Sequence, residues 1–198
     1  SMLLIERDLP GLSSQKITNK LGCRCSDTGE LIFEDCKVPA EYLLGEEGQG
    51  FEIAESSLAY GRMNIGARAV GIAQACLDAA LKYAQEREQF GVPIGRFQMI
   101  KWLLADMVAD VEAARLLVYK AAWLQDQGKP SMKAATVAKF FASEAGVRCT
   151  QAAMKIYGAY AFSEEYPVGR YHRDATLMTA GEGTSNICLL YTSDAADD

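Results

Sequence analysis

Three long stretches with a helical spacing of apolar residues dominate the chain between residues 51 and 156. In the first stretch Phe51, Ala54 and Leu58 recur at intervals of three and four, and the pattern continues to Ala84. An apolar residue on every turn marks the buried face of an α-helix. Because short Gly/Pro turns separate the stretches, neighbouring helices would run antiparallel. The sequence therefore predicts a helical bundle with up-down topology.

Two further helices are predicted on the same grounds. The second begins near Phe97 and, if it is continuous over residues 98–127, is about 45 Å long at 1.5 Å per residue. Gly128, with a proline two residues later, is a typical helix end. Ser131 can then cap a third helix, whose buried face runs as far as Ile156.

Residues 1–44 are strand-like instead. Short apolar runs at 3–5 and 30–34 are separated by turn signals such as Gly29, and residues 16–21 alternate weakly. These strands are too few for an independent β-sandwich. We therefore predict a mainly α fold class, in which a helical bundle is preceded by the last strands of a β domain.

Composition narrows the classes of function. The chain has 20 Lys and Arg against 26 Asp and Glu, a formal net charge of −6, so no basic surplus points to nucleic acid or to an anionic membrane. No apolar run is long enough to predict a membrane span. The six cysteines are scattered, with only Cys23 and Cys25 close together, so we expect no metal site. With His172 as the single histidine, acid–base chemistry would fall mainly to carboxylates.

The last eleven residues, 188–198, differ in texture from the rest of the chain. They read CLLYTSDAADD, a string that resembles the translation of a sequencing-library adapter. The alternative is a natural, acidic and frayed C-terminus. On the adapter interpretation residues 188–198 are a non-native tail, Cys188 and Tyr191 carry no function, and the chain is a piece of a longer protein.

The carboxylate most suited to chemistry lies in Gly181-Glu182-Gly183. Glycine permits unusual backbone angles and close approach of a ligand, and a glutamate in an apolar cleft can act as a general base. The alternative is an ordinary loop between helices, in which Glu182 and Thr184 only start the next helix.

A second polar segment covers residues 87–98. It combines the guanidinium of Arg87, the ring of Phe90, a glycine turn and the amide of Gln98. Arginine is suited to bidentate contact with phosphate, and a following helix N-terminus adds affinity for anions. The alternative is a polar turn in which Phe90 only packs against apolar neighbours.

Residues 158–162 form a loop of small residues beside aromatic residues. This loop could admit a flat ligand or simply allow close packing.

Together these segments resemble one family, the acyl-CoA dehydrogenases. Five blocks occur in that family's order and at its spacing: LGCRCSDTGELIFEDCKVP, EGQGF, GRMNIGARAVGIAQACLDAALKYAQEREQFG, the position of Gln98, and RYHRDA followed by GEGTSNI. The resemblance covers nearly all of residues 1–187. It implies that residues 1–46 are the end of the central β domain and that residues 47–187 are an incomplete C-terminal helical bundle domain.

The resemblance implies a catalytic role for Glu182, which matches the family's commonest base. It would remove the α-proton of an acyl-CoA thioester while the β-hydrogen leaves as hydride to FAD, and its own N–H would help to polarise the thioester carbonyl. Arg62 and Gly181 match positions near the acyl group. Some relatives carry the base beside this arginine, where this chain has Gly61. Gly181 replaces the bulkier tyrosine of many relatives, which would widen the pocket towards branched or cyclic acyl groups.

The resemblance also implies FAD as the cofactor. The residues that match the family's FAD contacts are Arg87, Phe90, Gln98, Lys155, Gly158 and Thr184. Three of them, Arg87, Phe90 and Gln98, match residues that reach the FAD of a neighbouring subunit, which implies an obligate homo-oligomer, a dimer or a tetramer. Lys155 replaces a glutamine of the family on the adenosine side of FAD.

The implied function is that of the C-terminal portion of an FAD-dependent acyl-CoA dehydrogenase. Its electrons would pass to an electron-transfer flavoprotein, in the cytoplasm or, in a eukaryote, in the mitochondrial matrix. A flavin enoyl-CoA reductase of the same fold would run the reaction in reverse, and the sequence does not separate the two. A non-catalytic helical assembly module is a third alternative, against which Glu182 and Arg87 argue. We expect the chain alone to be inactive, because part of the flavin and acyl pockets would lie outside it.

Overall fold

The computed structural model describes residues 1–194, with side chains as far as Thr192. The chain divides into two compact units, Ser1–Leu58 and Ala59–Asp198. The longest helix, α1 (Gly50–Glu86), begins in the first unit and continues through the second. The expected non-native tail falls partly outside this range, because residues 195–198 lie outside the described residues.

The first unit is built from two small antiparallel strand pairs. β1 (Met2–Leu3) pairs with β4 (Leu43–Leu44), after a short 3-10 helix η1 (Ala40–Tyr42). β2 (Leu12–Lys16) pairs with β3 (Gly29–Phe33) in a register that places Leu12 opposite Phe33. Both faces of β3 are exposed to solvent, so this hairpin has little apolar burial of its own.

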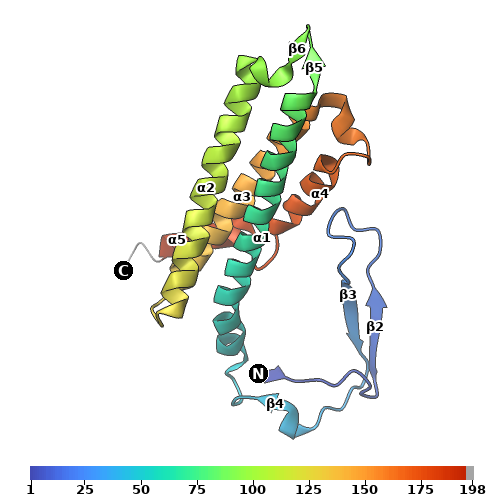
Figure 1. Ribbon diagram of the computed structural model, residues 1–198. Helices are drawn as coiled ribbons and strands as arrows, with labels where there is room; N and C mark the ends of the chain where they lie inside the picture. The colour runs from blue at the N-terminus through green and yellow to red at the C-terminus, as the bar shows by residue number, and fades with distance from the viewer. Residues whose placement is uncertain (195–198) are drawn as a thin grey trace. The chain divides into compact units, whose positions relative to one another are not determined.

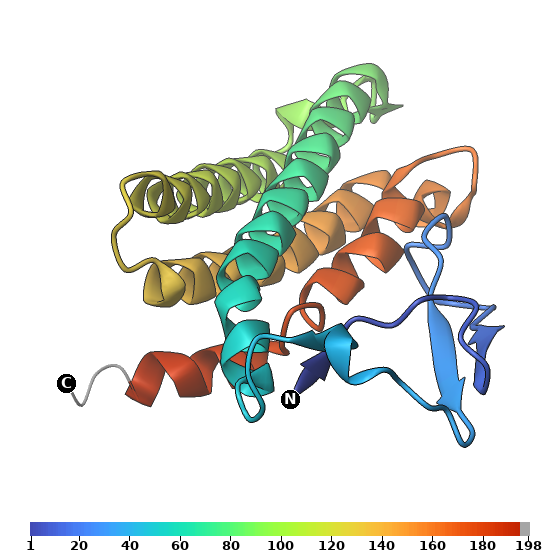
Figure 2. The same ribbon diagram turned by 90° about the horizontal axis from the view of Figure 1, so that it is seen from below.

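The second unit is a helical bundle. It continues α1 and adds α2 (Gln98–Asp126), α3 (Met132–Tyr157), α4 (Val168–Met178) and α5 (Ser185–Asp194). Figures 1 and 2 show α1, α2 and α3 alongside one another, and α3 packs against α2, α4 and α5. The predicted mainly α fold class is therefore confirmed. Within the described residues, no helix is both long and apolar enough to cross a membrane.

Small residues line the buried face of α3. Ala142, Ala145 and Cys149 are fully buried. A Cβ atom on Gly146 would lie 3.4 Å from the main-chain oxygen of Ala69 on α1. The glycine therefore lets α1 and α3 approach closely.

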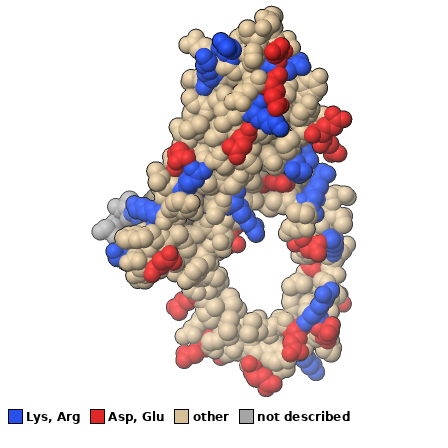
Figure 3. Space-filling view, viewed as in Figure 1, with Lys and Arg blue, Asp and Glu red and all other residues tan. Residues whose placement is uncertain are grey.

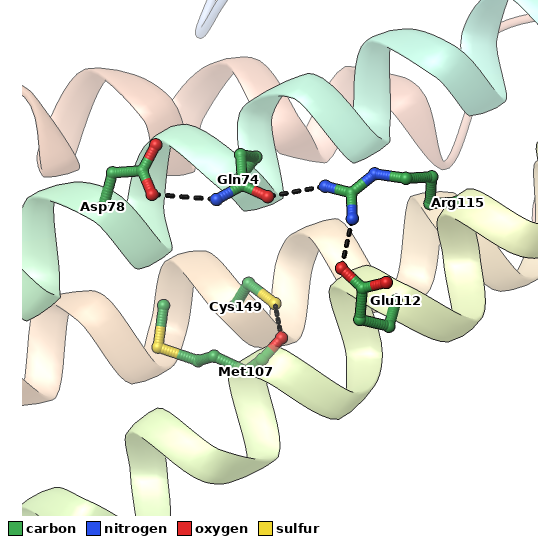
Figure 4. Close-up of polar contacts among 6 residues, drawn as sticks. All are labelled: Gln74, Asp78, Met107, Glu112, Arg115 and Cys149. Carbon is green, nitrogen blue, oxygen red and sulfur yellow. Dashed lines mark hydrogen bonds and ion pairs between the residues drawn. The ribbon is translucent and has the colours of Figure 1, made fainter.

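Polar side chains also link the helices (Figure 4). Arg115 of α2 donates to Oε1 of Gln74 on α1 at 2.6 Å and forms an ion pair with Glu112. The thiol of Cys149 lies 3.8 Å from the main-chain oxygen of Met107. Burial raises the pKa of the Cys149 thiol to about 12. Cys149 is therefore a core residue that stays a thiol at neutral pH.

Two local details differ from the sequence pattern. The weak alternation of residues 16–21 does not form a strand, because β2 ends at Lys16 and the main chain turns at Asn19, where φ is 57°. Ser131 does not cap α3 with its side chain. Its hydroxyl instead donates to Gln125, and its φ and ψ of −117° and −12° are near-helical rather than the extended angles of a side-chain cap.

Candidate active site

The residues from Thr179 to Thr184 join α4 to α5. The N–H of Ser185 donates to the carbonyl of Thr179 at 3.0 Å, so this loop is closed at its base. Oγ1 of Thr184 accepts a hydrogen bond from the N–H of Ile187 at 3.3 Å. Because Ile187 is the third residue of α5, this is the geometry of a helix N-cap, and Thr184 has a structural role at the start of that helix.

Glu182 lies at the tip of this loop with a constrained main chain. Its φ is 57°, in the left-handed region that non-glycine residues avoid, and the φ of Gly183 is 98°. A Cβ atom on Gly61 of α1 would lie 2.5 Å from Oε2 of Glu182. The carboxylate therefore packs directly over α1, in space that only a glycine at position 61 leaves free.

Arg62 follows Gly61 on α1 and is 2% exposed. Its Nη1 donates to Oγ1 of Thr136 at 2.7 Å, and its Nε donates to the main-chain oxygen of Glu182 at 3.3 Å. Its guanidinium also lies 4.9 Å from the centre of the Tyr191 ring. The arginine thus holds the main chain of Glu182 to the bundle.

Gly181 faces the interior of the bundle. A Cβ atom on it would lie 3.2 Å from Cδ1 of Ile65 and 3.6 Å from the carbonyl oxygen of Leu177. Ile65 would have to shift slightly for any larger residue. The structure therefore brings together four of the residues singled out in the sequence, which are Arg62, Gly181, Glu182 and Thr184.

Sequence reasoning missed one member of this cluster, Lys139 of α3. Its side chain is fully buried, and its Nζ donates to the carbonyls of Gly183 at 2.5 Å and Thr179 at 3.1 Å. Burial lowers the pKa of the Lys139 ammonium, and the charge of Arg62 adds to that shift. The signal for it is its place between Ala135 and Ala142 on the apolar face of the predicted helix.

The other predicted residues lie near the C-terminal end of α1. Arg87 directly follows the helix, whose last residue lies about 36 Å from Arg62 at 1.5 Å per residue. Phe90 is 93% exposed at the tip of the hairpin that β5 (Glu88–Gln89) and β6 (Val92–Pro93) form, before the 3-10 helix η2 (Ile94–Arg96). Gln98 begins α2 and is exposed, as is Lys155 in the last turn of α3.

A shallow pocket of about 270 Å³ lies at this end of the bundle. Arg87 and Gly158 line it together with Tyr83, Tyr157 and Tyr160, the last of these from the 3-10 helix η3 (Gly158–Phe162). The Arg87 guanidinium lies 5.4 Å from the centre of the Tyr160 ring. A guanidinium beside aromatic faces suits a ligand with both a phosphate and a flat ring.

On the face shown in Figure 3, the coloured charges of the bundle are interspersed rather than gathered by sign.

Comparison with known proteins identifies the protein family of this bundle. Residues 48–195 match the family model of the acyl-CoA dehydrogenase C-terminal domain. The chain therefore belongs to the acyl-CoA dehydrogenase family. The matched range runs into the expected non-native tail at 188–198, so the boundary of that tail stays a prediction.

Particular relatives cover nearly the whole chain. It is 46% identical to the acryloyl-CoA reductase (NADH) of Anaerotignum propionicum over 187 residues, which are 94% of this chain and 48% of that protein. It matches the structure of butyryl-CoA dehydrogenase from Megasphaera elsdenii with a TM-score of 0.96 and 46% identity, covering 99% of this chain and 51% of that one.

A third match is to a chain in the structure of the electron transferring flavoprotein of Acidaminococcus fermentans. The TM-score is 0.95 and the identity 46%, over 98% of this chain and 51% of that one. This chain thus spans about half the length of the curated relatives that it matches.

Proposed function

We propose that this chain is the C-terminal portion of an FAD-dependent acyl-CoA dehydrogenase and that Glu182 is its base. The observation that carries the proposal is the Glu182 carboxylate, which packs over Gly61 while Arg62 holds the main chain behind it. A carboxylate in a fixed place is what abstraction of a weakly acidic α-proton requires.

The main chain of Glu182 would contribute to the same step. Its N–H donates to no main-chain carbonyl among the residues that the structure describes, so it remains free to donate to the oxygen of a thioester. Such a donor stabilises the negative charge that develops on that oxygen as the proton leaves. The carboxylate and the N–H of one residue would then act on neighbouring atoms of the substrate.

FAD, when bound, would supply the acceptor for the hydride that leaves the β-carbon. The FAD contacts at one end of the bundle would come from Arg87, Phe90, Gln98, Lys155 and Gly158. Thr184 would contact FAD at the other end. The fit is supported by the guanidinium and the tyrosine rings of the pocket beside Gly158. Because the two ends are about 36 Å apart along α1, we infer that they serve FAD molecules of different subunits, as in a dimer or tetramer.

An apolar surface on α2 supports assembly. The helix carries six large apolar side chains that are exposed in the single chain, and several of them share one side of the helix. A second copy would remove this surface from water. The exposed residues are Met99, Trp102, Val108, Leu116, Tyr119 and Trp123.

The substrate would be an acyl-CoA with a short acyl chain, which the match to butyryl-CoA dehydrogenase supports. The match within the electron transferring flavoprotein structure supports an electron-transfer flavoprotein as the partner.

A second candidate is reduction of an enoyl-CoA by the same site. It is favoured by the 46% identity to acryloyl-CoA reductase (NADH). Glu182 would then return a proton to the α-carbon rather than remove it.

Substitution of Glu182 in the complete protein tests the proposal. We expect Glu182→Gln to keep its FAD and to lose about 10²–10⁴-fold in the rate of acyl-CoA-dependent flavin bleaching, because the amide cannot accept the proton. The matched control is Glu165→Gln, since Glu165 is an exposed glutamate away from the loop. If the flavin of Glu182→Gln is bleached at the wild-type rate, Glu182 is not the base.

A further inference from the structure

Lys139 is an unusual residue for the core of a helical bundle. It is one of the largest side chains that the fold buries completely, and a buried ammonium is costly unless it is hydrogen-bonded. Its two hydrogen bonds go to main-chain carbonyls, those of Thr179 and Gly183. The ammonium is therefore held by the loop that carries Glu182, and the loop is held by it.

The two carbonyls lie on either side of Glu182 in the chain. Thr179 is the C-cap of α4, where the helix dipole is negative and favours a cation. Gly183 directly follows Glu182. Because one ammonium binds both carbonyls, it fixes the distance between the two ends of the loop, which the hydrogen bond from Ser185 to Thr179 also closes.

A second buried cation acts on the same loop from another helix. Arg62 of α1 binds the carbonyl of Glu182 at 3.3 Å, and Lys139 of α3 binds the carbonyl of Gly183 at 2.5 Å. Two successive peptide groups are thus held from two helices. This matters because Glu182 has a φ of 57°, a conformation that a non-glycine residue keeps only where its surroundings impose it.

We propose that Lys139 is a positioning residue, whose buried ammonium ties the carbonyls of Thr179 and Gly183 and so fixes the carboxylate and the N–H of Glu182 for proton transfer. The part that concerns proton transfer rests on the proposed function. The part that concerns the loop stands on the contacts alone, and the two can be measured separately.

The test compares Lys139→Met with Lys139→Gln in the complete enzyme. The two side chains are similar in size, but only glutamine keeps an N–H donor for a carbonyl. A role in packing alone predicts that they behave alike, whereas a tether predicts that glutamine retains more function. Lys120→Met is the matched control, because Lys120 is an exposed lysine on α2.

Two measurements are made on each variant. The first is amide hydrogen exchange in peptides covering residues 179–188, which reports opening of the loop without any need for activity. The second is kcat and KM for acyl-CoA-dependent flavin reduction. We expect Lys139→Met to speed exchange in the loop only and to lower kcat by about 10²-fold at nearly unchanged KM, since a displaced base acts on a substrate that still binds. Lys139→Gln should fall between it and wild type.

The outcomes are distinct. Unchanged exchange in the loop of Lys139→Met, or equal losses of kcat in the Met and Gln variants, would overturn the positioning role. If Lys139→Met yields no soluble holoenzyme, Lys139→Gln against wild type decides by the same two measurements. A wild-type enzyme that shows no acyl-CoA-dependent flavin reduction would refute the proposed function, while the exchange measurement would still decide whether Lys139 holds the loop.

Discussion

Gly61 and Glu182 share a space that has room for only one side chain. A Cβ atom at position 61 would lie 2.5 Å from Oε2 and 2.6 Å from Cδ of the glutamate. No carbon and oxygen atoms pack at such distances without displacement. The glycine, which lies within a helix where it is intrinsically unfavourable, is therefore explained by the carboxylate that it admits.

Gly61→Ala is expected to separate stability from activity. Alanine favours the helix by about 0.5–1 kcal/mol relative to glycine, but its methyl group would displace the Glu182 carboxylate. We expect the complete enzyme to keep its FAD and to lose about 10²-fold in kcat, since a shift of the proposed base by 1 Å is enough for such a loss.

The control for this substitution lies on the same helix. Gly71→Ala introduces a methyl group that meets nothing within 4 Å, so it should stabilise the protein by a similar amount and leave kcat unchanged. Thermal unfolding and flavin bleaching of both variants provide the comparison. Equal activity of Gly61→Ala and wild type would show that the carboxylate does not need its place over α1.

The hairpin of β5 and β6 carries local strain at an exposed position. Its two-residue turn is formed by Phe90 and Gly91, with φ angles of 54° and 77°. A turn with positive φ at both positions favours Asn-Gly, and a bulky aromatic residue is disfavoured there. Phe90 makes an edge contact with Phe97, at 6.2 Å between ring centres, and is 93% exposed. Among the residues that the structure describes, no burial of the Phe90 ring therefore compensates for the strain.

Phe90→Asn should stabilise this hairpin and weaken the binding of FAD. Asparagine tolerates the left-handed conformation, so we expect the 198-residue chain to gain about 1 kcal/mol in the free energy of unfolding. The complete enzyme should lose FAD more readily, because Phe90 is proposed to contact FAD of a neighbouring subunit. Denaturant unfolding and the ratio of flavin to protein give the two results.

Phe162→Asn is the control for exposure alone, because Phe162 is exposed but is not among the residues with positive φ. It should change the free energy of unfolding by less than about 0.5 kcal/mol. A destabilised Phe90→Asn variant would mean that the turn holds no strain that asparagine can relieve.

The helices of the bundle could be predicted because their apolar spacing is long and regular. The stripe that begins at Phe97 predicted a helix over residues 98–127, and α2 covers Gln98–Asp126. The place of Lys139 could not be predicted in the same way, because its partners are main-chain carbonyls some 40 residues away. Periodicity indicates which face of a helix is buried and does not indicate which loop will cover it.

For the whole molecule, the main consequence is that the proposed site residues fall into two separate part-sites on one chain. Glu182 and Arg62 lie beside the first half of α1, and Arg87 and the tyrosine pocket follow its C-terminal end. A residue-by-residue resemblance could predict both sets. Their separation of about 36 Å follows from the uninterrupted length of α1, which the apolar pattern as far as Ala84 predicted.

We expect the 198-residue chain by itself to bind FAD weakly or not at all and to show no acyl-CoA dehydrogenase activity. Each part-site offers only some of the proposed contacts, and the exposed apolar residues of α2 favour self-association. Light scattering, and flavin retained after addition of excess FAD and gel filtration, are the measurements. Stoichiometric FAD with acyl-CoA-dependent bleaching would contradict the expectation.

The exposed apolar surface of α2 also determines what tryptophan fluorescence reports about this protein. The chain has two tryptophans, Trp102 and Trp123, and both lie on α2 with exposed fractions of 59% and 53%. Their fluorescence therefore comes from the outer side of one helix and not from the core or from the loop around Glu182. An emission maximum that moves to shorter wavelength as concentration rises would mark the covering of that surface, in a protein that needs no added dye.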